Sequence, residues 1–192
     1  MTKAKRILFH VSIIHSVEDM GSLSSDLPAQ RGYREHVLGR WAQIERLVRE
    51  LDLNWPEVKV YQDGLPNSSR DIVEKVLIET QGLNFYLLRW LVAQGAELVG
   101  TESPTLLKEE YDHLRAVVTA RDDSDKAMAR RAYAERASAL LSERDAYIAQ
   151  RIAETLPHGA VGLLFIGQAH RVAWRLPPDI KIRQLSHQTL DK

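Results

Sequence analysis

Four apolar stretches of the chain each end near a side chain that can bind a metal ion or transfer a proton. These side chains are His15, Asp63, Glu102 and His170, in the order of the stretches. Imidazole and carboxylate groups serve as general acids and bases in enzymes, and both also bind divalent metal ions. Two histidines and two acidic residues therefore predict acid–base or metal-assisted chemistry, provided that the fold gathers them in one place.

The four stretches themselves are typical of buried β-strands. They cover residues 7–14, 58–61, 96–100 and 161–166, and they are short and rich in branched apolar side chains. Amphipathic helical patterns separate them, and residues 178–185 alternate in polarity as an edge strand does. We therefore predict a single α/β domain over residues 1–192, with a mainly parallel sheet of about five strands and helices on both faces.

The interval before the fourth predicted strand is long for a simple crossover. It covers about 55 residues and includes a stretch from Asp123 to Leu156 that is rich in Ala, Arg and Glu. We expect this helical excursion to cover one side of the sheet. Within it, Arg144 and Asp145 lie just before an apolar face and are interpreted as a structural ion pair.

The strand ends predict a common site. Parallel strands place their carboxyl ends at one edge, which is where open α/β sheets bind ligands. Two ionised carboxylates in one cleft repel each other, so a proton or a cation must offset them. One solution is a divalent metal ion of unspecified identity, bound by His15, His170, Glu102 and Asp63 with an open position for water. A histidine and a glutamate that activate water without metal are the other solution.

Taken singly, each of these residues also has an ordinary structural explanation. Asp63 precedes Gly64, as turn aspartates often do. Glu102 lies just before a predicted helix start, where the helix dipole favours a carboxylate. The functional interpretation therefore depends on four such residues occupying equivalent positions along the predicted sheet.

Two further segments are candidates for substrate contact. Gly167 and Gln168 directly precede His170, and glycine permits a close approach of backbone to ligand. Ser69 and Arg70 lie at a predicted helix start, where free N–H groups and a guanidinium can bind phosphate or carboxylate. A capped helix with a solvated arginine explains the second segment equally simply.

Composition narrows the function classes. The chain has 26 basic and 26 acidic residues, so no overall positive field favours nucleic acid. It has no cysteine, which excludes thiol catalysis and thiolate metal sites. No apolar run approaches the roughly 18 residues of a membrane span. We expect a cytoplasmic protein without nucleic-acid or membrane partners, and a homo-oligomer stays open because the four tryptophans suit a core or an interface.

The segment from Arg144 to His170 resembles one superfamily of proteins. It reads Arg144-Asp145-Ala146-Tyr147-Ile148-Ala149, then a helix end, then Leu164-Phe165-Ile166-Gly167-Gln168-Ala169-His170. This order is similar to the superfamily of TraB/PrgY pheromone-shutdown proteins, TIKI proteases, erythromycin esterases and ChaN haem-binding proteins. In that superfamily an R-D helix precedes an apolar strand that ends in G-x-x-H.

The resemblance implies a hydrolase of a small-molecule or peptide-like substrate. Its active site would contain His170, His15 and Glu102, with one divalent metal ion as an optional cofactor. The resemblance also implies an alternative, a non-catalytic protein of the ChaN-like type that binds haem, a metal ion or a metabolite. A signalling or assembly protein with a degenerate site is the third interpretation, because Ser12 stands where the superfamily has glycine.

Overall fold

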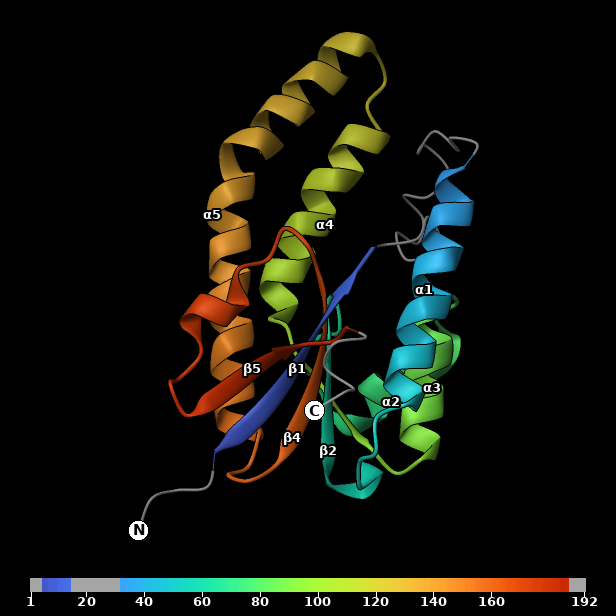
Figure 1. The fold of residues 1–192 in the computed structure, drawn as a ribbon. Helices are drawn as coiled ribbons and strands as arrows, with labels where there is room; N and C mark the ends of the chain where they lie inside the picture. The colour runs from blue at the N-terminus through green and yellow to red at the C-terminus, as the bar shows by residue number, and fades with distance from the viewer. Residues whose placement is uncertain (1–4, 15–31, 187–192) are drawn as a thin grey trace.

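A five-stranded, all-parallel sheet forms the centre of the protein in the computed structural model, which describes residues 5–14 and 32–186 (Figure 1). Its strands are β1 (Arg6–Ile13), β2 (Val58–Gln62), β3 (Glu97–Val99), β4 (Val161–Gly167) and β5 (Ile180–Gln184). They lie in the order β3-β2-β4-β1-β5. The predicted α/β class is confirmed, and β5 occupies the edge position that its alternation indicated.

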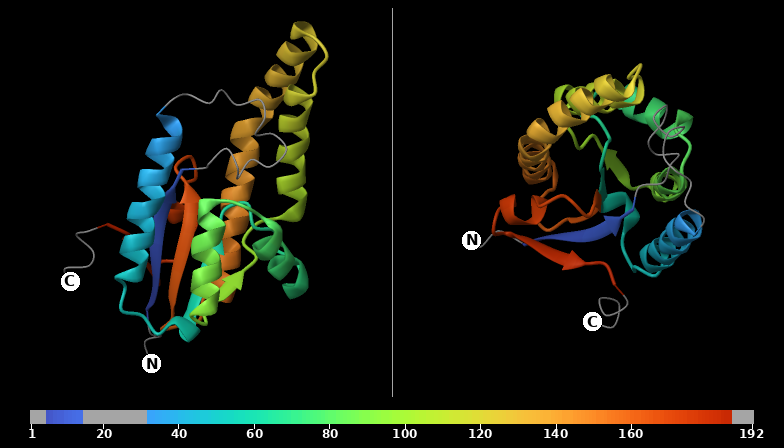
Figure 2. Two further views of the ribbon diagram at one scale, coloured as in Figure 1. Left: turned by 90° about the vertical axis from the view of Figure 1, so that its right-hand side faces the viewer. Right: turned by 90° about the horizontal axis from the view of Figure 1, so that it is seen from above.

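Helices cover both faces of this sheet (Figure 2). They are α1 (Tyr33–Arg49), α2 (Arg70–Glu79), α3 (Leu83–Ala93), α4 (Pro104–Val118) and α5 (Asp123–Thr155), with short 3₁₀ turns η2 (Trp55–Glu57) and η3 (Val172–Arg175). Within the described residues, no helix has the length and apolar character needed to cross a membrane.

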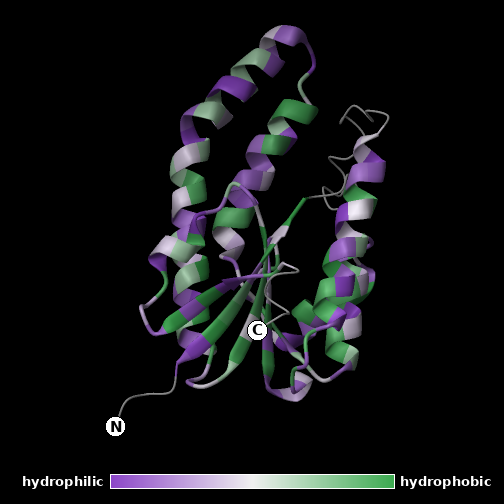
Figure 3. Ribbon diagram, viewed as in Figure 1, coloured by the Kyte–Doolittle hydropathy of each residue, from purple (hydrophilic) through white to green (hydrophobic). Residues whose placement is uncertain are grey.

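Alternation along the central strands divides the core into two apolar clusters. Phe9 and Val11 of β1 pack with α1 and α3, whereas Leu8 belongs to the cluster under α5. Leu163 and Leu164 of β4 divide in the same way. Figure 3 shows the resulting apolar colouring of the sheet. Since both faces of β4 are buried, its sequence is continuously apolar, as the strand prediction assumed, whereas β1 also contains polar residues.

The helical excursion before β4 is a hairpin of α4 and α5. The 33 residues of α5 correspond to about 50 Å of helix, and its buried residues all lie between Leu140 and Ile152. This later half packs on the sheet, whereas the first half and α4 extend beyond the carboxyl edge (Figures 1 and 2). Both helix starts are capped, by Ser103 Oγ and by an Asp122 carboxylate oxygen. The hairpin therefore rises as a wall above the strand ends.

Candidate functional site

Three of the four residues that motivated the site come together at the carboxyl edge of the sheet. Asp63 follows β2, Glu102 follows β3, and His170 lies three residues after the end of β4. An isolated parallel bridge between Pro66 and Glu102 continues the alignment of β2 with β3 beyond the strands. The fourth residue, His15, lies outside the described residues.

The guanidinium of Arg144, on α5, joins the two strand-end carboxylates. Its Nε atom donates to Glu102 Oε2 at 2.6 Å, and its Nη2 atom donates to Glu102 Oε1 at 2.6 Å and to Asp63 Oδ1 at 3.0 Å. Its Nη1 atom donates to Glu110 of α4. All three nitrogens of this buried side chain are therefore bound to carboxylates. The cation that offsets the converging carboxylates is therefore Arg144 itself, which α5 places above the strand ends.

His170 lies between two aspartates. Its Nδ1 atom is 2.6 Å from Asp145 Oδ1, and its Nε2 atom is 3.5 Å from Asp63 Oδ2. Asp145 Oδ2 also accepts a hydrogen bond of 2.7 Å from the backbone N–H of Arg171. The contact with Asp145 fixes the ring orientation, so Nε2 is the nitrogen presented to Asp63.

Backbone groups at the strand ends hold the acidic side chains in place. The N–H of Gly64 donates to Glu102 Oε1 at 2.8 Å, and the N–H of Gly167 donates to Asp63 Oδ2 at 3.0 Å. Gly64 has a φ of 77°, a left-handed conformation that glycine adopts without strain. The turns after β2 and β4 therefore supply hydrogen-bond donors as well as chain reversal.

The surroundings of His170 and Glu102 raise the pKa of both groups. Burial alone lowers the pKa of His170, but its hydrogen bonds to Asp145 and Asp63 outweigh this effect and raise the pKa to about 9. Burial raises the pKa of Glu102 above the usual carboxyl value, against the opposing effect of Arg144. Asp63 raises it further. At neutral pH His170 is therefore an imidazolium, and burial favours the protonated form of Glu102.

A cavity of about 670 Å³ opens above this cluster. Asp63, Glu110, Arg144 and His170 contribute its charged surface. Its remaining walls come from the end of β1, from α2 and α3, and from the α4–α5 hairpin; they include Ile13, Ile14, Val76, Phe85, Leu107, Leu114 and Leu141. The volume is in the range of pockets for small organic ligands, about 300–1,000 Å³.

The candidate substrate-binding residues divide into two groups. Gly167 and Gln168 line the cavity beside His170. Ser69 and Arg70 lie at the start of α2, are exposed, and are not among the described residues that line the cavity. Arg70 instead pairs with Glu74 on the same helix. The structure thus brings only the β4 segment to the predicted site. Arg70 is solvated, as the simpler explanation of the α2 segment expected, although Ser69 makes no side-chain capping hydrogen bond with the described residues.

The donor set does not fit the predicted metal ion. Both oxygens of Glu102 and both of Asp63 already accept hydrogen bonds from Arg144 or backbone N–H groups. His170 directs one ring nitrogen to Asp145 and the other towards Asp63. Among the described residues, no group of three or more acidic or histidine side chains is arranged for metal binding. The same engagement of both ring nitrogens leaves His170 poorly suited to ligate haem.

Sequence reasoning missed the roles of Arg144, Asp145 and Glu110. The first two were interpreted as a structural pair, but Arg144 binds Asp63, Glu102 and Glu110, whereas Asp145 binds His170. The sequence signal that could have indicated these roles was the adjacency of Arg144 and Asp145 within one helix. Consecutive residues on a helix point about 100° apart, so one can bind the groups after β2 and β3 while the other binds His170 after β4.

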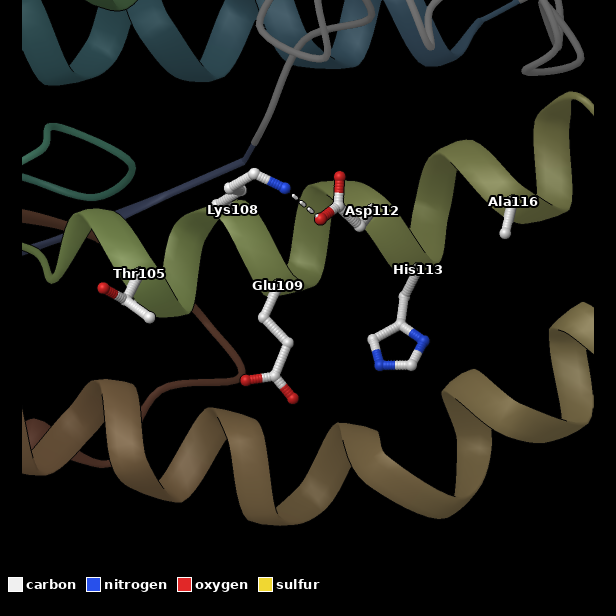
Figure 4. A pocket seen from close by; sticks show the side chains of 6 residues that line it. All are labelled: Thr105, Lys108, Glu109, Asp112, His113 and Ala116. Atoms are coloured by element: carbon white, nitrogen blue, oxygen red, sulfur yellow. Dashed lines mark hydrogen bonds and ion pairs between the residues drawn. The ribbon is translucent and has the colours of Figure 1, made fainter.

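A second hollow, of about 400 Å³, lies along α4 (Figure 4). Figure 4 shows Glu109 and His113 pointing towards α5, while Lys108 and Asp112 pair on the other side of α4. Glu109 is bound by Arg136 at 2.6 Å. None of the residues lining this hollow is buried, so it lacks the desolvated polar groups that mark the larger cavity.

No family model, curated protein or solved structure matches this chain. The resemblance of the Arg144–His170 segment to the TraB and ChaN superfamily therefore stays a prediction. The chemistry of the site follows from its own geometry.

Proposed function

We propose that the protein is a hydrolase of a small-molecule or peptide-like ester or amide. The observation that carries this proposal is the pairing of His170 Nε2 with Asp63 Oδ2 at 3.5 Å in the wall of the cavity. An imidazolium and a carboxylate side by side supply a general acid and a general base without a metal ion. Both groups are buried, which strengthens their effect on a bound substrate.

The reaction uses water and the substrate carbonyl. Asp63 accepts a proton from water as the water oxygen bonds to the carbonyl carbon. His170 donates its Nε2 proton to the leaving oxygen or nitrogen as the bond from that atom to the carbonyl carbon breaks. The proton on Asp63 then returns to His170 across the 3.5 Å between them, which restores both groups.

Asp145, Arg144 and Glu102 act as positioning residues in this scheme. Asp145 keeps His170 oriented and cationic through the 2.6 Å contact with Nδ1. Arg144 fixes the positions of Asp63 and Glu102 through its hydrogen bonds to both carboxyl groups. Glu102 has a relative exposure of 0% and is not among the described residues lining the cavity, so we assign it to holding Arg144 rather than to activating water.

The experiment is a screen of neutral and cationic aryl esters and anilides, followed by substitution of the acid and the base. We expect His170→Asn and Asp63→Asn each to lower kcat at least about 100-fold, the usual contribution of general acid–base catalysis. His158→Asn is the matched control because His158 is half exposed and lies at the opposite edge of the sheet, near Asp179. Circular dichroism establishes that each variant is folded.

Unchanged turnover in a folded His170→Asn variant refutes the assigned acid. A full screen without turnover favours the alternative, a binding protein that holds a metabolite in the same cavity. One observation supports that alternative: the oxygens of Asp63 and Glu102 already accept hydrogen bonds within the protein. Visible absorption of the purified protein tests the haem version of it. Membership of the TraB and ChaN superfamily, a cytoplasmic location and a homo-oligomer remain predictions.

A further inference from the structure

The charges at the inner end of the cavity do not balance. Among the described residues, four carboxyl groups, those of Asp63, Glu102, Glu110 and Asp145, meet two cationic groups, Arg144 and His170. With all of them ionised, this end of the cavity is negative. Burial is the main cause of the raised pKa of Glu102, and the neighbouring Asp63 adds to it against the opposing effect of Arg144.

The cationic groups are also poorly placed to receive an anionic ligand. Each nitrogen of Arg144 already donates to a carboxylate, and His170 lies between Asp145 and Asp63. An incoming carboxylate or phosphate would have to displace an internal acid to reach either group. A cation can still reach Glu110, because its side chain lines the cavity, retains 26% exposure, and keeps further carboxylate lone pairs beside the bonds from Arg144 and Tyr133.

Apolar side chains form much of the remaining lining of the cavity. They are Leu107 and Leu114 of α4, which flank Glu110 on one face of that helix, Leu141 of α5, Val76 of α2 and Phe85 of α3. Tyr133 also lines the cavity, and its hydroxyl donates to Glu110 Oε1 at 3.2 Å. A ligand that matches this surface has an apolar body and a positively charged end.

We propose that the cavity selects amphipathic cations, meaning esters or amides whose apolar body carries a protonated amine, and that Glu110 is the specificity-determining residue for that amine. The hydrolysis of these ligands rests on the proposed function, whereas the preference for a cationic ligand does not. Phosphoesters and substrates with a free carboxylate are then poor ligands of the same site.

Three probes of equal length separate charge from apolar contact: 4-phenylbutylamine, 4-phenylbutanol and 4-phenylbutyrate. Isothermal titration calorimetry should show the amine binding about tenfold more tightly than the alcohol, as expected for one charge-assisted contact, and the butyrate more weakly than both. Glu110→Gln should remove most of the preference for the amine while leaving the affinity for the alcohol within about twofold. Glu109→Gln is the matched control, since Glu109 lines the hollow outside the cavity.

Equal affinity for amine and butyrate overturns the proposal, as does a Glu110→Gln variant that keeps the full preference. If Glu110→Gln does not fold, raising the salt concentration provides the second test, because the amine preference must then weaken while the affinity for the alcohol does not fall. Binding of the amine without turnover of any ester supports the selectivity and refutes the hydrolase. Turnover of anionic esters as fast as of cationic ones supports the hydrolase and refutes the selectivity.

Discussion

Two arginines with the same exposure lie at opposite edges of the sheet. Arg6, in β1 at the amino edge, and Arg144, above the carboxyl edge, each have a side-chain exposure of 7%. Arg6 binds one partly exposed carboxylate, Asp179, and two backbone carbonyls at the end of α5. Arg144 binds three carboxylates and lines a cavity. Burial of a charge alone therefore does not identify a site; unbalanced charge beside a cavity does.

Removal of each arginine sharpens this comparison and gives the largest expected effect. Arg144→Met leaves buried Glu102 without a cation and Asp63 with His170 alone, and we expect a loss of about 3–5 kcal/mol in the free energy of unfolding. Arg6→Met leaves Asp179, which is 35% exposed and can be hydrated, so we expect about 1–3 kcal/mol. Urea unfolding of both variants measures the difference.

Arg131→Met is the control for the first substitution. Arg131 lies on the same helix, is 83% exposed, and pairs with Glu135. Its loss should change the unfolding free energy by no more than about 0.5 kcal/mol. If Arg6→Met destabilises the protein as much as Arg144→Met does, the carboxyl edge holds no special surplus of charge.

The two edges should also differ in their response to pH. The pKa of His170 is about 9 in the folded protein and near 6.5 in the unfolded chain. Its stabilising contribution is therefore complete below pH 6.5 and is lost as the pH rises through 9. We expect a fall of up to about 3 kcal/mol in unfolding free energy across this interval. Turnover by the proposed acid should disappear over the upper part of the same range.

Urea unfolding of His170→Gln from pH 6 to 10 tests this assignment, because the variant should lose most of the pH dependence in that interval. His158→Gln, at the amino edge, should keep it. A slope that persists in His170→Gln means that another group titrates, and the protonated state assigned to His170 would then be wrong.

The fold was predictable because its signals are local. Branched apolar runs such as Val161–Gly167 have to be buried on both faces, and parallel strands follow once helices separate them. The convergence of Asp63, Glu102 and His170 followed from that topology, because residues after parallel strands share one edge. These inferences used the apolar pattern within each element and the position of each residue shortly after its strand.

The rest of the site depends on long-range packing. Arg144 is 42 residues from Glu102 along the chain, and its orientation depends on how α5 lies across the sheet. The apolar periodicity of a helix does not predict whether a buried arginine contacts one carboxylate or three. The metal prediction, which stays a prediction, offset these charges with an external ion because sequence spacing could not locate the arginine that contacts them.

Alanine at Gly100 should disturb the carboxyl edge more than alanine at Gly162 disturbs the core. A Cβ at Gly100 would lie 2.6 Å from the carbonyl oxygen of Pro66 and 2.7 Å from Cα of Asn67, which are backbone atoms. At Gly162 its nearest neighbour is a Leu8 methyl at 2.9 Å, which can move. We expect losses of about 1–3 kcal/mol for Gly100→Ala and smaller ones for Gly162→Ala by urea unfolding. Equal losses would show that the β2 and β3 ends can shift without strain.

Chelation should have the smallest effect of all. Since Arg144 and backbone N–H groups occupy the oxygens of Asp63 and Glu102, a metal ion would have to displace a guanidinium to bind them. We expect prolonged dialysis of untagged protein against EDTA to change kcat by less than about twofold, because the acid and base of the proposed reaction are both side chains. Elemental analysis before and after dialysis provides the control. If the protein instead contains a stoichiometric metal ion and loses turnover when it is removed, the ion must displace Arg144 from the carboxylates. Asp63 and Glu102 would then have the ligand role first predicted for them.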